Sequence, residues 1–411
     1  MLLIFHNIYG SMLLLCIFAL FTPVLSAKMK LFKIPTLILE IIVGIILGKS
    51  FLDLFASQHE QLRYLSEIGV LFFMLVLGLE INPDIIFRKS NGPKTTNPLV
   101  LVLIIFVSSL VISFAFGYIL YHFGIIKNIY IISVIIAATA PGIVIPVLKE
   151  NNISDTFYGQ TIVLYMTISE VICLFLISSY SHLSLMGLVY NILIVLGIFV
   201  TVKVFKTVKD KVGDRYTTLK VNSFFNLESR FALAIMFIFA TIFYMLNYDV
   251  VLGAYLAGIT LAIVLKKSEK EVIHKQLDTI GFGFFIPLFF IITGSNLNIP
   301  AVFSSWNVIV LIPCLFGLMF LAKFIPAFLF TKVFGKKLAM HTGSLLAAQF
   351  SLLLIGSAIA LENHIIDETF YSALVVTALI SSLVLPVIFL KFINKNKQKL
   401  NLDSPAVSTS M

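Results

Sequence analysis

The sequence predicts an all-α polytopic membrane protein with about thirteen transmembrane helices. Of its 411 residues, 59% are hydrophobic and only 12% are charged, whereas soluble domains average about 25% charged residues. Apolar runs of roughly 20 residues, enough to cross about 30 Å of hydrocarbon, recur along the whole chain. Because backbone polar groups in lipid need internal partners, runs of this length are expected to be helices.

The apolar runs leave no stretch long enough for a soluble domain. We expect one transmembrane domain over residues 1–393, with a cytoplasmic linker at residues 203–230 between its halves. A cytoplasmic tail at residues 394–411 is too short to fold alone. The expected spans are residues 8–27, 34–50, 64–81, 99–121, 129–148, 160–180, 183–202, 231–247, 250–265, 279–296, 306–331, 342–361 and 370–393.

Lysine and arginine residues predict the orientation of the spans. The chain holds 29 of them, and nearly all fall in alternate loops on one side of the membrane. Such a bias marks the cytoplasmic side, so the N-terminus is expected outside and the C-terminus in the cytoplasm. The formal net charge of +9 then belongs to the inner face of a multi-pass cell-membrane protein, which argues against nucleic acid as a partner.

The first expected span has features of a signal-peptide core followed by a small-residue cleavage site. The segment before it holds His6 but no Lys or Arg, and the positive charges Lys28, Lys30 and Lys33 follow it instead. A signal peptide has the opposite charge order. We therefore expect a retained helix.

Acidic residues occur in the next two spans. Glu40 lies well inside residues 34–50, and Glu67 and Glu80 lie near the two ends of residues 64–81. We interpret Glu40 as a structural residue. Glu67 is a secondary candidate whose carboxylate reaches water at the end of its span.

Two segments on opposite sides of the linker resemble each other. LFFMLVLGLEIN begins at Leu71 in the third span, and LFFIITGSNLN begins at Leu288 in the tenth. The two spans are seven positions apart, an odd number, so the segments run in opposite directions. This is the pattern of the inverted repeats found in many secondary transporters, with a chance match as the alternative.

Helix-breaking residues interrupt the fifth span, which contains AATAPGIVIPVLKE. Pro141 and Pro146 lack backbone donors, so carbonyl groups near Thr139 and Ala140 are expected to be free at membrane depth. Free carbonyl groups can coordinate a cation, and transporters commonly bind ions where helices are discontinuous. The alternative is an ordinary proline kink that only packs.

Two charged residues lie deep in later spans: Glu170 within LYMTISEVICLFLIS and Lys323 within LFGLMFLAKFIPAFLF. A charge in lipid is costly unless it is neutralised or paired. A carboxylate that either a proton or a metal cation can neutralise, but not both at once, favours a proton-coupled ion site. The alternative is a structural Glu–Lys pair that fixes helix packing.

Motifs of other functional classes are missing from the sequence. It has no P-loop, HExxH, GxSxG or TVGYG-like segment, so we expect neither an enzyme nor an ATP-driven pump nor a potassium filter. Cys16, Cys173 and Cys314 are dispersed in apolar spans. We therefore expect no disulfide, no transition-metal site and no cofactor.

Six motifs in order resemble the monovalent cation:proton antiporters. They point to the branch of bacterial sodium/proton and potassium/proton exchangers that includes the membrane domain of the glutathione-gated potassium efflux proteins. The resemblance covers nearly the whole chain. The motifs are KIPTLILEIIVGIILGKS, LSEIGVLFFMLVLGLEINPD, AATAPGIVIPVLKE, GQTIVLYMTISEV, VLGAYLAGITLA and FFIPLFFIITGSNLN.

This resemblance implies exchange of a monovalent cation, Na⁺ in preference to K⁺, for H⁺ by alternating access. It also implies a homodimer in the lipid bilayer, with a dimerisation part and a core of two inverted repeats with crossing, discontinuous helices. The fifth and twelfth spans would be the discontinuous pair. A gated cation channel or uniporter is one alternative, and a relative without transport that acts as an interaction partner is another.

By resemblance, the paired polar site of the family falls on Ser169 and Glu170, and its membrane lysine on Lys323. Glu170 would carry the ion and the proton. Two departures leave the cation and the stoichiometry open. Ser169 replaces an acid or amide and would supply a neutral hydroxyl, and the run from Gln349 to Ser351 lacks the Gly-Glu-Phe common at that place.

Overall fold

A computed structural model gives the structure of the chain. The expected span at 183–202 lies outside the residues that it describes, as do most of the linker at 203–230 and most of the tail at 394–411. The described residues are 8–28, 36–54, 59–80, 98–139, 141–151, 153–154, 156–182, 227–246, 248–265, 267–300 and 306–396.

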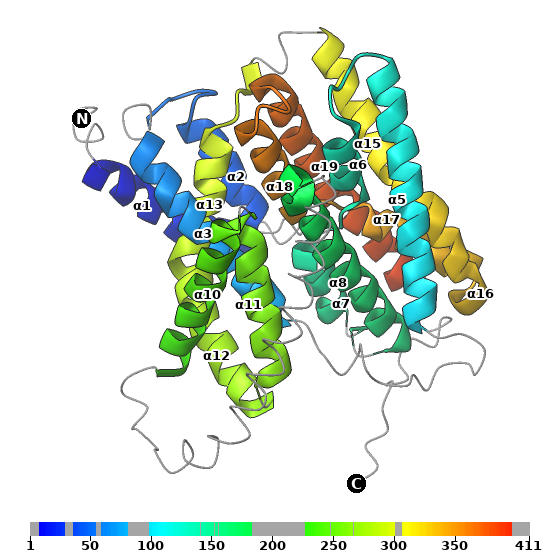
Figure 1. Ribbon diagram of the computed structural model, residues 1–411, viewed down its shortest axis with the longest axis horizontal. Helices are drawn as coiled ribbons and strands as arrows, with labels where there is room; N and C mark the ends of the chain where they lie inside the picture. Colours follow the sequence, from blue (N-terminus) through cyan, green and yellow to red (C-terminus); the bar gives the residue numbers. More distant parts are fainter. Residues whose placement is uncertain are drawn as a thin grey trace. The chain divides into compact units, whose positions relative to one another are not determined.

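Helices make up all the regular structure in the described residues (Figure 1). Within those residues, nine helices are long and apolar enough to cross a membrane, and three shorter apolar helices accompany them. The predicted all-α polytopic architecture is confirmed, whereas the total of thirteen spans stays a prediction.

The chain divides into two compact units, each built from both halves of the sequence. Unit one combines residues 1–28 and 36–83 with residues 178–296. Unit two combines residues 29–35 and 84–177 with residues 297–411. The described helices of unit one are α1 (Ile8–Lys28), α2 (Thr36–Leu47), α3 (His59–Glu80), η4 (Ser179–His182), α10 (Leu227–Met245), α11 (Val250–Val264), α12 (Lys267–Ile280), η6 (Gly281–Phe285) and α13 (Ile286–Ser295). Those of unit two are α5 (Pro98–His122), α6 (Ile129–Ala137), α7 (Pro141–Glu150), α8 (Phe157–Ser178), α15 (Trp306–Ala327), η7 (Phe328–Phe330), α16 (Thr331–Phe334), α17 (Lys336–Leu346), α18 (Ser351–Glu362) and α19 (Glu368–Asn396).

In unit one, the two similar sequence segments pack against each other. They lie in α3 and α13, where Phe73 and Phe290 hold matching positions and their ring centroids meet edge to face at 5.3 Å. Gly78 brings α3 close to α11, and the matching Gly294 brings α13 close to α2. Matching residues that touch are what two inverted repeats produce around a pseudo-twofold axis.

Unit two repeats its helix order. The first half supplies the long helix α5, the interrupted helix α6–α7 and the long helix α8. The second half supplies α15, the interrupted helix α17–α18 and α19 in the same order. The two interrupted helices contact each other through α6 and α18. The expected pair of discontinuous helices in the fifth and twelfth spans is therefore confirmed.

The first interruption has a local cause. Asn128 caps the start of helix α6, because its side chain accepts a hydrogen bond from the Ile131 amide at 3.0 Å. Ala138 then takes an extended conformation, with φ −65° and ψ 167°, and α7 starts at Pro141, where a missing N–H is tolerated. The end of α6 therefore presents carbonyl groups that have no partner within the helix.

The second interruption, residues 347–350, contains no proline. Phe350 has φ −149° and ψ −75°, and α18 starts directly after it without a side-chain cap. Ala, Gln and Phe are not helix breakers, so tertiary contacts override local propensity at this place.

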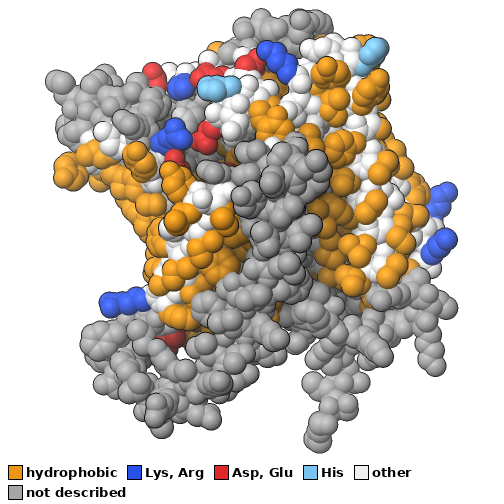
Figure 2. Space-filling view, viewed as in Figure 1, with side chains coloured by type: hydrophobic (Ala, Val, Ile, Leu, Met, Phe, Trp, Pro, Cys, Tyr) orange, Lys and Arg blue, Asp and Glu red, His pale blue; other side chains and the backbone are white. Residues whose placement is uncertain are grey.

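Hydrophobic side chains cover much of the visible faces of the described helices, and charged side chains gather toward helix ends (Figure 2). On α5, for example, Val100, Ile104, Val107 and Val111 are exposed at helical spacing. An apolar surface of this extent suits lipid rather than water.

Candidate ion-binding site

Glu170 and Ser169 lie side by side in α8, within unit two. Both side chains have 0% of their surface exposed. A carboxyl group held inside protein at this depth is costly unless a proton, a cation or hydrogen bonds stabilise it.

The carbonyl group of Ala137, at the end of α6, receives two side chains from other helices. The Ser169 hydroxyl donates to it at 3.3 Å. The ammonium group of Lys323, which is 1% exposed on α15, donates to the same oxygen. Side chains from α8 and α15 therefore meet at one backbone oxygen at the end of α6.

Tyr165 holds the other side of the lysine. Its hydroxyl oxygen lies 3.5 Å from Lys323 Nζ, and its ring centroid lies 5.7 Å from the same atom, within the range of a cation–π contact. Within the described part of the chain, Ala137 and Tyr165 are the hydrogen-bond partners of Lys323, and a Glu170–Lys323 ion pair is not among its contacts.

Gln349 joins the two interruptions. It lies between α17 and α18 with 1% of its surface exposed, and its side-chain amide donates to the Ile136 carbonyl oxygen at 2.7 Å. Its own backbone carbonyl contacts the Ser381 hydroxyl of α19 at 3.1 Å. One side chain thus bridges from the second broken helix to the last turn of the first.

The remaining residues expected at the first interruption are placed in part. Thr139 lies in the break with 1% of its surface exposed, and its hydroxyl makes no hydrogen bond within the described residues. Pro141 begins α7 and Pro146 lies inside it. Ala140 and the side chain of Pro146 lie outside the described residues.

The acidic candidates of the second and third spans belong to unit one rather than to the unit that holds Glu170. Glu40 is 2% exposed in α2, and its Oε2 makes no hydrogen bond within the described residues. Glu67 is exposed on α3 and accepts a hydrogen bond from Arg63 Nε, one helical turn away, at 3.0 Å.

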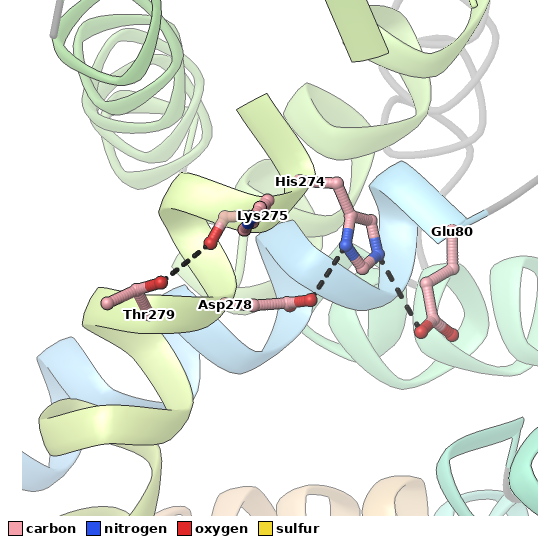
Figure 3. A network of polar contacts seen from close by, with 5 residues as sticks. All are labelled: Glu80, His274, Lys275, Asp278 and Thr279. Carbon is pink, nitrogen blue, oxygen red and sulfur yellow. Dashed lines mark hydrogen bonds and ion pairs between the residues drawn. The ribbon is translucent and has the colours of Figure 1, made fainter. Parts of the chain in front are cut away.

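Glu80 takes part in a separate polar cluster at the end of α3 (Figure 3). His274 of α12 lies between two carboxylates, with Nδ1 at 2.8 Å from Asp278 Oδ2 and Nε2 at 3.7 Å from Glu80 Oε1. An imidazole ring donates from both nitrogens only when it is protonated. This cluster links α3 to α12, and we see in it an electrostatic contact between helices rather than an ion site.

Sequence reasoning missed Tyr165 and the part played by Ala137. Tyr165 lies four residues before Ser169 and therefore on the same face of α8, so helical spacing was the signal that could have found it. An aromatic residue in an apolar span is ordinarily a packing residue, and a backbone carbonyl leaves no trace in composition. Among the described residues, no group of His, Cys, Asp and Glu side chains is arranged to hold a metal ion.

A multi-pass helical protein with a repeated helix order, paired discontinuous helices and a buried carboxyl group in the same unit belongs to the class of secondary transporters. Residues 16–394 match the model of the family described as sodium/hydrogen exchanger, transmembrane. The chain therefore belongs to this family of membrane transporters.

Named relatives cover most of the chain. It is 28% identical over 402 residues to a putative Na⁺/H⁺ antiporter, YjbQ, of Bacillus subtilis, which covers 96% of this chain and 64% of that protein. The Na⁺/H⁺ antiporter of Enterococcus hirae is 27% identical, over 93% of this chain and 98% of that one. The probable Na⁺/H⁺ antiporter 3 of Methanocaldococcus jannaschii is 26% identical, over 88% of this chain and 91% of that one. The chain thus spans less than two thirds of the length of the first of these relatives and nearly all of the length of the other two.

A solved structure has the same fold. The sodium proton antiporter MjNhaP1 from Methanocaldococcus jannaschii at pH 8 matches with a TM-score of 0.66, covering 98% of this chain and 100% of that chain. At 15% sequence identity, this likeness establishes the helical architecture alone.

Proposed function

We propose that this chain exchanges a monovalent cation, Na⁺ in preference to K⁺, for H⁺ across the membrane by alternating access. The observation that carries the proposal is the buried Glu170 next to Ser169, whose hydroxyl reaches the Ala137 carbonyl at the end of an interrupted helix. Membership of the sodium/hydrogen exchanger family supports it. The names of the relatives, all of them Na⁺/H⁺ antiporters, support Na⁺ as the cation.

Glu170 is the group that changes partner during the cycle. Its carboxylate takes either a proton or a cation, and the two exclude each other because one negative charge is neutralised by one positive charge. When the site faces one side it releases one and takes the other. Competition at a site that opens alternately to each side is exchange.

Neutral oxygens complete the cation shell in this proposal. Ser169 supplies a hydroxyl group and the interruption around Thr139 and Ala140 supplies hydroxyl and carbonyl oxygens. Hard monovalent cations are well served by such ligands, since carbonyl oxygens can replace the ion's hydration shell. Pro141, the first residue of α7, lacks the backbone N–H that a continuous helix would need at this place, whereas Pro146 lies inside α7.

Lys323 places a basic group at membrane depth beside the site. Its contacts to Ala137 and Tyr165 hold the ammonium group without a second carboxylate. With Ser169 in place of an acid, Glu170 is the one acidic member of the pair. We therefore propose one-for-one exchange.

We assign the ion-carrying core to unit two and the dimerisation part of a homodimer to unit one, as the family resemblance implies. We also propose that the protein lies in the cell membrane. The lysine and arginine distribution supports an external N-terminus, a cytoplasmic linker at 203–230 and a cytoplasmic tail at 394–411.

Proton flux in proteoliposomes tests the function. Purified protein is reconstituted with a pH dye inside, and Na⁺, Li⁺ or K⁺ is added outside. We expect a pH change that depends on the cation and is largest with Na⁺ or Li⁺. A labelled cation that crosses without any pH change would indicate a channel or uniporter instead, and no movement of ions at all would indicate an interaction partner.

A further inference from the structure

Gln349 presents one end of its side-chain amide to the first broken helix. The Ile136 carbonyl oxygen can only accept a hydrogen bond, so the group that faces it at 2.7 Å must be the donor, Nε2. The orientation of the amide is thereby fixed. Its oxygen, Oε1, points away from this bond and is free to serve a different partner.

Two buried oxygens at the second interruption make no hydrogen bond within the described residues: Gln349 Oε1 and Ser351 Oγ. Both side chains are 1% exposed. A buried acceptor without a partner costs folding free energy. The other hydroxyl group of α18 avoids this cost, because Ser357 donates to the Leu354 carbonyl at 3.0 Å. Two unpartnered oxygens two residues apart therefore call for a ligand.

The location points to the ligand. Gln349 binds Ile136, and the next carbonyl along the chain, Ala137, is the one that Ser169 and Lys323 contact. The Gln349 amide and Ser169, the neighbour of Glu170 in the chain, therefore contact the same end of α6. Oxygen ligands without charge are the ones that a desolvated alkali cation accepts without altering the charge balance of the site.

We propose that Gln349 Oε1 and Ser351 Oγ are further ligands of the transported cation, supplied by the second discontinuous helix. This inference rests on the proposed function of Glu170 as the charged ligand and adds the neutral side of the shell. The number and strength of the neutral ligands sets the preference among Na⁺, Li⁺ and K⁺. Gln349 is therefore a specificity-determining residue.

The test compares Gln349→Met and Ser351→Ala with the wild-type protein and with Ser357→Ala as the matched control on the same helix. Each protein is purified, and its melting temperature is measured with and without Na⁺, Li⁺ and K⁺. Bound cation raises the melting temperature of the form that binds it. The apparent KM for Na⁺ and the cation preference are measured in proteoliposomes.

Ser351→Ala gives the sharpest result. Without Na⁺ this variant should melt at or above the wild-type temperature, because it removes an unsatisfied buried oxygen. With Na⁺ it should gain less than the wild type, and its KM for Na⁺ should rise about tenfold, the loss expected for one ligand. Gln349→Met should raise the KM at least as much and change the cation preference. Ser357→Ala should lower the melting temperature slightly and leave the Na⁺-induced rise intact.

The proposal is wrong if Ser351→Ala and Gln349→Met keep the wild-type KM, cation preference and Na⁺-induced rise in melting temperature. It is also wrong if no cation stabilises the wild-type protein. Should Gln349→Met fail to fold, Ser351→Ala decides alone. Failure of the antiport itself shows differently, as an absence of proton flux in the wild type, whereas loss of Na⁺ stabilisation in Ser351→Ala would still support the ligands.

Discussion

Ser169 is the residue that most changes the chemistry of the site. Its hydroxyl donates to the Ala137 carbonyl at 3.3 Å, so it positions a neutral oxygen beside Glu170 where an acid would add a second negative charge. In the proposed cycle, one carboxylate balances one cation or one proton. The charge balance of that cycle then depends on Glu170.

Lowering the pH should weaken Na⁺ binding. If a proton and Na⁺ compete for the single Glu170 carboxylate, as proposed, the apparent KM for Na⁺ should rise by about tenfold per pH unit once the carboxyl group is mostly protonated. The rate at saturating Na⁺ should change much less. Initial exchange rates over a grid of Na⁺ concentrations and pH values measure this. A KM that is independent of pH, or one that rises about a hundredfold per unit, would contradict a single titrating group.

At the residue scale, the sequence identified the charged residues and missed their partners. Glu170 and Lys323 were visible because charge in an apolar run is rare. Tyr165 was invisible because an aromatic residue in a span is ordinary. The direct Glu–Lys pair weighed as an alternative is not among the described contacts, since the ammonium group reaches Ala137 and Tyr165 instead.

The helices of unit one pack through glycines. A Cβ atom at Gly44 in α2 would lie 2.0 Å from the Ile291 carbonyl oxygen in α13, and one at Gly48 would lie 2.2 Å from Ser295. The spacing of these two glycines is the GxxxG pattern that lets membrane helices approach closely. The close approach of α2 and α13 depends on the absence of side chains there.

Gly44→Ala should destabilise the protein. The added methyl group meets backbone that cannot move aside, which costs about 1–3 kcal/mol. The control is Gly283→Ala, also in unit one, where nothing lies within 4 Å of the new Cβ atom. Thermal unfolding of both variants in detergent measures the difference. Equal melting temperatures would show that α2 and α13 do not pack as closely as described.

The two interruptions differ in how far the sequence could predict them. Pro141 and Pro146 predicted the first interruption, because proline removes a backbone donor. The second lies in AAQF, which contains no helix breaker, and only the family resemblance indicated it. Side-chain contacts of Gln349 and Ser381 accompany that interruption, and such tertiary contacts cannot be read from local propensity.

At the scale of the whole molecule, the short repeat LFFMLVLGLEIN and LFFIITGSNLN was a reliable signal of architecture. The matching Phe73 and Phe290 touch, and each unit draws helices from both halves of the chain. Apolar length predicted the class of fold. The division into two units could not be predicted from composition, because apolar helices long enough to span a membrane occur in both units.

One-for-one exchange predicts a transport rate that does not depend on the membrane potential. The site carries the same charge with a proton as with Na⁺, provided that Lys323 keeps one charge state throughout. A membrane potential imposed with K⁺ and valinomycin should therefore leave the rate of Na⁺-driven proton flux unchanged. A rate that follows the potential would mean that a second group, Lys323 first, changes its charge during the cycle.

The central claim is that Glu170 carries both the cation and the proton, and one measurement tests it most directly. Na⁺-driven proton flux is recorded in proteoliposomes with wild type, Glu170→Gln and Glu67→Gln. Glu67 is the matched control, because it is an exposed glutamate paired only with Arg63 among its described hydrogen bonds. We expect Glu67→Gln to retain exchange and Glu170→Gln to lose it while melting near the wild-type temperature. Exchange that persists in a folded Glu170→Gln protein would contradict the account.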